Sequence, residues 1–137
     1  MNTSPVVRIL MAEDNDADVL LFKEALRTSS VNFELERYTD GDACIRSLAA
    51  HSAPLPDLIV IDLNMPRVGG FEILKTVRGD VRFAAVPVAV VTSSSSESER
   101  LKSVNLGANA FIVKPSRLRE FLTTVGTSIK ALLHHGA

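Results

Sequence analysis

The chain has 137 residues, with 15 Lys and Arg against 16 Asp and Glu, so its formal net charge at pH 7 is -1. Its length suits one domain, and 46% hydrophobic residues exclude a disordered chain. The balanced charge argues against a nucleic-acid partner, which needs a basic face. No apolar stretch approaches the roughly 20 residues of a membrane span, and Met1–Arg8 does not resemble a secretory signal, so we expect a cytoplasmic protein without a membrane partner.

Strand and helix patterns alternate along the first half of the chain. An apolar run at 6–12 predicts a strand, and helical spacing of apolar residues predicts a helix over about 17–27. Segment 33–38 alternates apolar and acidic residues, which predicts an edge strand with one solvent-facing side. Asp40-Gly41 is a turn signal before a second helix. The predicted apolar stripe of that helix consists of Ile45, Leu48 and Ala49.

The middle of the chain repeats the alternation with more strongly apolar strands. Residues 58–61 are apolar at every position, which is typical of a central parallel strand covered on both faces. Gly69-Gly70 precedes a third helical pattern, and a second fully apolar strand runs over 87–91. Ser96 and Glu99 have the spacing of a capping box, which predicts the start of a fourth helix.

The last strand–helix pair completes a five-fold repeat. Residues 110–113 predict the fifth strand, and a final helix is expected over about 117–133. Five such units predict a flavodoxin-like (βα)5 fold, a doubly wound parallel α/β sheet, and the order 2-1-3-4-5 would place the alternating second strand at an edge. The predicted apolar face of the final helix consists of Leu118, Phe121, Leu122, Val125, Ile129 and Leu132.

Polar residues follow four of these strands at their carboxyl ends. Glu13-Asp14 follows the first strand and Asp62 the third, while Thr92 follows the fourth and Lys114 the fifth. In open parallel sheets ligands bind outside these strand ends, where the strand order reverses. We therefore expect three carboxylates, a hydroxyl and an ammonium to meet at one rim.

This set of groups has a definite chemistry. Carboxylates gathered at one point repel each other unless a cation binds, and hard oxygen ligands suit Mg²⁺ with water and phosphate. Lys114 and Thr92 would contact phosphate oxygens. Asp62, at the centre, is the candidate nucleophile, because a carboxylate can attack phosphorus to give an acyl phosphate.

Each residue also has a simpler interpretation by itself. Glu13-Asp14 would be a turn pair, and we expect Asp16 to cap the first helix. Lys114 would be a solvated loop residue, and the Thr92 hydroxyl would bond locally. The combination on four strand ends in the right order favours the functional interpretation.

The signatures at these strand ends resemble those of the receiver domain of two-component response regulators, across essentially the whole chain. The matching segments are 11–15, 62–66 with 69–70, 91–93 and 111–115. The resemblance implies that Asp62 accepts a phosphoryl group from the phosphohistidine of a sensor histidine kinase. It also implies that Asp14, Asp62 and the backbone carbonyl of Asn64 bind Mg²⁺ directly, and that Glu13 binds it through water.

The resemblance further implies a switch. Thr92 and Lys114 would contact the phosphoryl group, and Phe111 stands at the position of the aromatic switch residue. Movement of Thr92 would shift its loop, free space for Phe111 and alter a protein-binding face near 97–106, the fifth strand and the last helix. Catalysis would be limited to Mg²⁺-dependent self-phosphorylation and slow self-dephosphorylation, so the chain would not be an enzyme in the usual sense.

We expect a single receiver domain over residues 1–137, with its core at about 6–133 and no output domain. The partners would be a kinase and a downstream protein target or relay protein. A narrower resemblance, to single-domain regulators that partner bacterial phytochrome kinases, rests on 13–15 with 17–18, 62–64 with 66–67, and 106–109. It implies a phytochrome-type kinase and leaves a homodimer as an open alternative.

Three other functions would use a similar sheet. A dehalogenase-type phosphatase needs a second Asp two residues after its nucleophile, where this chain has Asn64. A flavodoxin-like cofactor binder needs a phosphate-cradling loop after the first strand, where this chain has an acidic segment. A phosphorylation-independent docking module is the third alternative.

Overall fold

The computed structural model describes residues 5–52 and 54–135, which form a five-stranded parallel sheet in the order β2-β1-β3-β4-β5. This architecture confirms the predicted fold class. The strands are β1 (Val7–Ala12), β2 (Phe33–Tyr38), β3 (Leu58–Ile61), β4 (Val88–Thr92) and β5 (Ala110–Val113). The helices are α1 (Asp16–Thr28), α2 (Gly41–Ala49), α3 (Gly70–Arg78), α4 (Glu97–Asn105) and α5 (Leu118–His135), with a short 3-10 helix η1 (Val81–Phe83) before β4.

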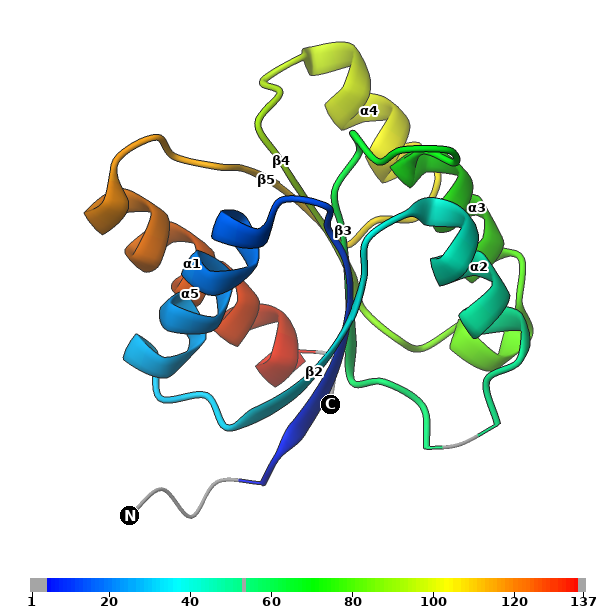
Figure 1. Cartoon of the computed structure of the whole chain (residues 1–137), viewed down its shortest axis with the longest axis horizontal. Helices are drawn as coiled ribbons and strands as arrows, with labels where there is room; N and C mark the ends of the chain where they lie inside the picture. Colours follow the sequence, from blue (N-terminus) through cyan, green and yellow to red (C-terminus); the bar gives the residue numbers. More distant parts are fainter. Residues whose placement is uncertain (1–4, 53, 136–137) are drawn as a thin grey trace.

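Helices cover both faces of the sheet. Figure 1 shows α1 and α5 on one face and α2, α3 and α4 on the other. Successive side chains of a strand point to opposite faces, so Ile9 and Met11 pack with α1 and α5 while Leu10 and Ala12 pack with α2 and α3. Every residue of β3 and β4 is buried, as expected for central strands. In β2 half-buried and exposed residues alternate, which confirms its place at the edge.

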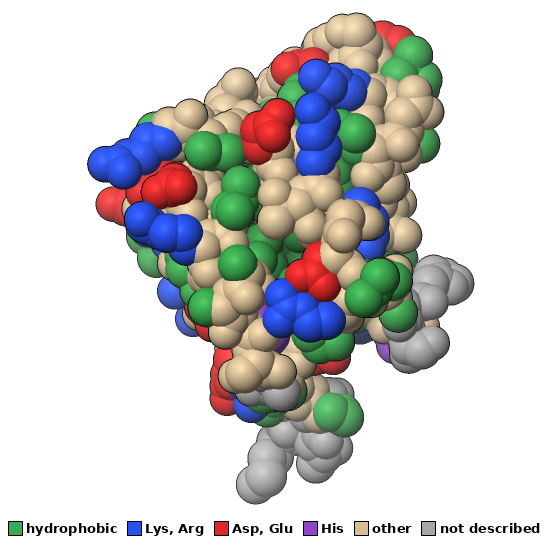
Figure 2. Space-filling view, turned by 90° about the vertical axis from the view of Figure 1, so that its right-hand side faces the viewer, with side chains coloured by type: hydrophobic (Ala, Val, Ile, Leu, Met, Phe, Trp, Pro, Cys, Tyr) green, Lys and Arg blue, Asp and Glu red, His purple; other side chains and the backbone are tan. Residues whose placement is uncertain are grey.

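The charged groups on the face of the molecule formed by α2 and α3 are mixed in sign. Figure 2, which faces α2 and α3, shows Lys and Arg interspersed with Asp and Glu around small hydrophobic areas. On the face shown, no basic field of the kind that binds nucleic acid is present. None of the helices within 5–52 and 54–135 has the length and apolar character needed to cross a membrane.

The helix caps agree with the sequence prediction at α4 and differ at α1. Ser96 caps α4 and accepts a hydrogen bond from the backbone N–H of Glu99 at 3.3 Å. At α1 the cap is Asn15, whose Oδ1 accepts from the N–H of Asp18 at 3.0 Å, so the prediction of Asp16 as the cap is wrong. The helix begins at Asp16, one residue earlier than the apolar spacing predicts, and this moves the cap to Asn15.

Two predicted apolar stripes also shift. The buried face of α2 consists of Gly41, Cys44 and Leu48, whereas Ala49 is exposed. In α5, Leu118 is 60% exposed and burial begins at Phe121. In the view of Figure 1 the first turn of α5, in orange, lies farther from the sheet than the rest of the helix.

The carboxyl end of β3 is in close contact with the start of α3. An ideal Cβ on Gly70 would lie 2.5 Å from the carbonyl oxygen of Asp62, which is closer than real Cβ contacts. The neighbouring Gly69 has no such restriction, because its Cβ would meet only the carbonyl oxygen of Leu63 at 3.6 Å. Gly70 therefore allows the backbone to bring α3 against Asp62, the residue that follows β3.

We predict that Gly70→Ala destabilises the protein by about 1–3 kcal/mol, because the added methyl group overpacks a rigid backbone contact. Gly69→Ala is the matched control and should cost less. Urea unfolding of the two variants and the wild type measures the difference. Equal stabilities for the two variants would contradict the steric role of Gly70.

Candidate functional site

Three carboxylates converge at the carboxyl ends of β1 and β3. Glu13, Asp14 and Asp62 each place a carboxylate oxygen within 4.8 Å of the others. Glu13 is 1% exposed and Asp62 is 7% exposed, whereas Asp14 faces solvent. The structure thus brings together the acidic residues that the sequence places on two separate strand ends, and it leaves one side of the cluster open.

Lys114, which follows β5, lies inside this cluster. Its Nζ donates to Glu13 Oε1 at 2.7 Å and to Asp62 Oδ2 at 3.0 Å. A third bond, at 2.7 Å, goes to Oδ2 of Asp18. The Lys114 side chain is only 7% exposed, so it is a buried ion-paired group and not a solvated loop residue.

Backbone N–H groups hold two of the carboxylates in place. Asn64 N–H donates to Asp62 Oδ1 at 3.0 Å, and Asn15 N–H donates to Glu13 Oε2 at 3.2 Å. Both oxygens of Asp62 therefore accept a hydrogen bond, one from Asn64 and the other from Lys114. These bonds orient the Asp62 carboxylate at the rim.

Thr92 ends β4 at the same rim and is fully buried. Its Oγ1 accepts a bond from Ser94 N–H at 3.2 Å, so the local interaction that the sequence allows is present. A hydroxyl that accepts one bond can still donate its own proton. The backbone carbonyl of Thr92 accepts from Lys114 N–H at 2.7 Å, which links the two strand ends.

Phe111 is the second residue of β5. It is half-buried and packs against the apolar cluster between the sheet and the α2–α4 layer. Phenylalanine has no hydroxyl, so packing alone determines the position of its ring.

Burial and neighbouring charges shift the pKa values of two residues of the site. Burial, the hydrogen bond to Asp62 and its charge raise the pKa of Glu13 to about 7, although Lys114 acts in the opposite direction. Burial would lower the pKa of Lys114, but its bonds to Asp18 and Glu13 and the nearby negative charges outweigh burial and raise it. Lys114 is therefore a permanent cation, while Glu13 gains or loses a proton near neutral pH.

The donor set fits a divalent metal ion. Three carboxylates from two strands supply oxygen ligands, which hard cations such as Mg²⁺ prefer. Asp14 is exposed, so an ion can reach the cluster from solvent. The Lys114 ammonium already places one positive charge between Glu13 and Asp62.

Two site residues lie outside the predicted set. The pattern of polar residues at strand ends does not assign a role to Asp18. Asp18 is nevertheless the third residue of α1 after the Asn15 cap, which places it at the end of the helix that faces the rim. Arg37, at the end of β2, donates from Nε to the backbone carbonyl of Glu13 at 2.9 Å and pairs with Asp16 at 2.6 Å. Nothing in the pattern of an edge strand indicates this contact.

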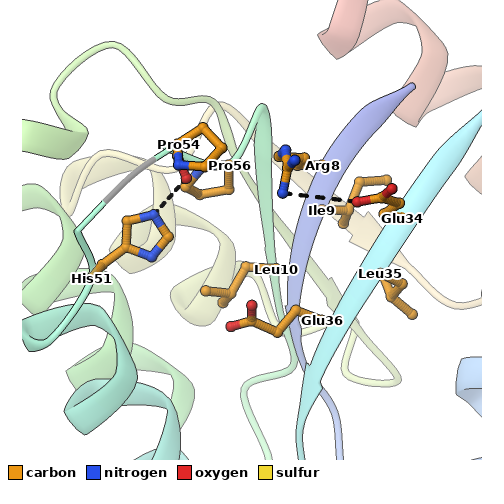
Figure 3. Close-up of a pocket in the computed structure, with 9 residues that line it drawn as sticks. All are labelled: Arg8, Ile9, Leu10, Glu34, Leu35, Glu36, His51, Pro54 and Pro56. Carbon is orange, nitrogen blue, oxygen red and sulfur yellow. Dashed lines mark hydrogen bonds and ion pairs between the residues drawn. The ribbon is translucent and has the colours of Figure 1, made fainter. Parts of the chain in front are cut away.

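A separate cavity of about 350 Å³ lies toward the amino ends of β1 and β3. Figure 3 shows His51, Pro54 and Pro56 on one side of it and residues of β2 on the other, with Arg8 directed toward Glu34. It shares no residue with the acidic site. Its lining consists of Arg8, Ile9, Leu10, Glu34, Leu35, Glu36, His51, Pro54 and Pro56.

Comparison with known proteins identifies this arrangement. The model of the response regulator receiver domain matches residues 9–126. The chain belongs to the response regulator receiver domain family. Receiver domains are in general signalling modules and not enzymes, and their partners are histidine kinases.

Two relatives extend over nearly the whole receiver domain. Response regulator Rcp1 of Synechocystis sp. is 32% identical over 127 residues, which is 90% of this chain and 86% of Rcp1. The crystal structure of the phosphorylated cyanobacterial phytochrome response regulator RcpA matches with a TM-score of 0.86 at 31% identity over 96% of both chains. The Mn²⁺-bound form of Rcp1 matches with a TM-score of 0.83 at 31% identity, over 93% of this chain and 94% of that one.

We predict that a divalent ion raises the melting temperature more at pH 8 than at pH 6. The pKa of Glu13 is about 7 in the metal-free fold, above its ordinary value of 4.5. The unfolded chain therefore releases this proton at lower pH than the folded chain does, and the metal-free fold loses stability as the pH rises from 4.5 to about 7. The ionised carboxylate also attracts the cation most strongly. Thermal unfolding with MgCl₂ or MnCl₂ measures the shift.

Asp14→Asn is the control, since Asp14 is an exposed member of the cluster. This variant should fold normally and lose most of the metal-induced shift. An equal shift in the wild type and the variant would place the bound ion elsewhere.

Proposed function

We propose that this receiver accepts a phosphoryl group on Asp62 from the phosphohistidine of a histidine kinase, in a Mg²⁺-dependent step. One observation carries this proposal. The Asp62 carboxylate belongs to the three-carboxylate cluster and is held by the Asn64 N–H and the Lys114 ammonium. An aspartate nucleophile placed beside a fixed cation and a divalent-ion site is what phosphoryl transfer requires.

Asp62, Lys114 and Thr92 have different roles in the proposed phosphoryl transfer. An Asp62 oxygen attacks phosphorus, the P–N bond of the donor breaks, and the imidazole leaves with the electron pair. The product on Asp62 is a mixed carboxylic–phosphoric anhydride. Lys114 and Thr92 contact the phosphoryl oxygens, the first as a cation and the second as a hydroxyl donor.

Asp14, Asp62 and the backbone carbonyl of Asn64 would hold Mg²⁺ directly, and Glu13 would hold it through water. The ion supplies positive charge against the phosphoryl oxygens. The Mn²⁺-bound form of Rcp1 supports binding of a divalent ion, and the three carboxylates supply the oxygen ligands that Mg²⁺ prefers.

The signal would leave through the face formed by α4, β5 and α5. Phosphorylation adds nearly two negative charges and strong acceptor oxygens beside buried Thr92. A shift of Thr92 toward them moves the loop to α4 and makes room for Phe111 to change its packing. That face carries exposed apolar residues suited to a downstream protein or relay partner, namely Leu101, Val104, Val113 and Leu118.

A phytochrome-type kinase is the donor that the relatives favour. RcpA is described as a cyanobacterial phytochrome response regulator, and it covers 96% of this chain. The segments of the narrower resemblance include Asp18, which contacts Lys114 in this structure. The exposed apolar residues on the face of α4, β5 and α5 would also suit a homodimer, which we include in the proposed function.

The contacts of the site argue against the phosphatase alternative. Asn64 donates its backbone N–H to Asp62 and has no titratable side chain to shuttle a proton. The loop after β1 carries carboxylates, so it would repel the phosphate of a flavin cofactor.

We predict that acetyl phosphate and Mg²⁺ add one phosphoryl group to the wild type and none to Asp62→Asn, as read by intact mass. Hydroxylamine should remove the group, because it cleaves acyl phosphates. Asp57→Asn is the matched control, since Asp57 lies before β3 and accepts a bond from Arg8 N–H at 2.8 Å. An unmodified wild type, also with a phytochrome-type kinase as donor, would instead identify a phosphorylation-independent docking module.

We predict that Thr92→Ala is still phosphorylated but loses most phosphorylation-dependent partner binding, because no hydroxyl pulls the loop toward the phosphoryl group. Pull-down or calorimetry with the phosphorylated protein measures this. Ser94→Ala, whose backbone bond to Thr92 is retained, is the control. Full phosphorylation-dependent binding by Thr92→Ala would contradict the switch.

A further inference from the structure

Lys114 has three hydrogen-bond partners, and they are not equivalent. Its ammonium carries three protons, and its three bonds go to Glu13, Asp62 and Asp18. Glu13 and Asp62 belong to the carboxylate cluster that fits a divalent ion, whereas Asp18 does not. Asp18 is thus the one contact of the Lys114 ammonium that lies outside the cluster.

This difference matters once the cluster carries a metal ion. Glu13 and Asp62 then share their negative charge with that ion, and their attraction for Lys114 falls while repulsion between the cations rises. A lysine side chain has a flexible stem and a strongly hydrated head, so it moves to solvent when its partners are lost. Asp18 keeps its full charge at 2.7 Å from Nζ and opposes this movement.

Asp18 is held firmly enough to do so. It is the third residue of α1, and its N–H bonds the Asn15 cap at 3.0 Å. The next residue, Val19, is 5% exposed and packs in the core between the sheet and α5, and Phe22 follows one turn later at 1% exposed. The Asp18 side chain is 24% exposed, which leaves its bond to Lys114 partly shielded from water.

We propose that Asp18 is a positioning residue for phosphoryl transfer, which retains the Lys114 ammonium beside Asp62 when the acidic cluster binds a divalent ion. The inference rests on the proposed function of Asp62. Asp18 itself does not touch the phosphoryl group. It acts through Lys114, whose ammonium then donates to a phosphoryl oxygen as the bond to Asp62 forms.

Asp16 offers a matched control. It lies in the same first turn of α1 and adds the same charge to the amino end of the helix, but it pairs with Arg37 at 2.6 Å. Asp16→Ala and Asp18→Ala therefore remove equal charge from one helix turn, and only the second removes a partner of Lys114.

The first test observes Lys114 directly, in the presence of Mg²⁺ alone. Nitrogen-15 NMR of the lysine ammonium groups, with the Lys114 signal assigned by its loss in Lys114→Ala, reports whether the ammonium is held or solvated. The wild type and Asp16→Ala should keep a slowly exchanging Lys114 signal at saturating Mg²⁺, and Asp18→Ala should lose it. A retained signal in Asp18→Ala would overturn the inference.

The second test is the rate of phosphorylation by acetyl phosphate at saturating Mg²⁺, measured by intact mass. Loss of one charge-assisted hydrogen bond should slow Asp18→Ala by about tenfold, with Asp16→Ala close to the wild type. In a Lys114→Ala background the Asp18→Ala change should have almost no further effect, which a general structural role would not produce.

The outcomes separate the two proposals. If the wild type is modified on Asp62 and Asp18→Ala reacts at the same rate, the positioning role is wrong and the proposed function stands. If the wild type is not modified at all, the proposed function fails and the positioning role fails with it. A slow Asp18→Ala whose defect persists in the Lys114→Ala background would show that Asp18 does not act through Lys114.

Discussion

One buried ammonium joins the parts of this molecule that carry its chemistry. Lys114, after β5, makes ion pairs with residues that precede it by 52 to 101 positions in the chain, namely Glu13, Asp18 and Asp62. Buried carboxylates are tolerated only when they are paired, because removal of a partner leaves an uncompensated charge. Lys114 therefore compensates the negative charge that the carboxyl ends of β1 and β3 and the first turn of α1 bring to the rim.

The same pairing leaves the site incompletely neutralised, and this makes it functional. One ammonium is paired with three carboxylates, and the pKa of Glu13 rises to about 7, first because the residue is buried and then because Asp62 lies beside it. A divalent ion, or a phosphoryl group bound together with one, stabilises a site of this kind by neutralising its negative charge. Stability of the metal-free fold and readiness for phosphoryl chemistry thus oppose each other at the rim.

The sheet supplies the precision that this chemistry needs. Parallel strands end at one edge, and the fully buried β3 and β4 are fixed by packing on both faces. Asp62 follows β3 directly, Thr92 is the last residue of β4, and Gly70 lets α3 approach within contact of Asp62. Side chains on such elements are held in place more closely than side chains on free loops.

The sequence alone determined the five strand–helix units, the edge position of β2 and the convergence of Glu13, Asp14, Asp62 and Lys114. These features follow from local patterns: period-two and fully apolar strands, and the rule that parallel strands end together. The resemblance of the motifs to receiver domains added the family.

Only the tertiary structure decided the finer contacts. The cap at Asn15, the exposure of Leu118 and the contacts of Asp18 and Arg37 all depend on where a helix begins, how far it extends past the sheet and how it is rotated about its axis. A shift of one residue turns a helix by about 100°, which is enough to move a side chain from the rim to solvent. Patterns along the chain do not define that angle, because it is set by packing between segments that are distant in sequence.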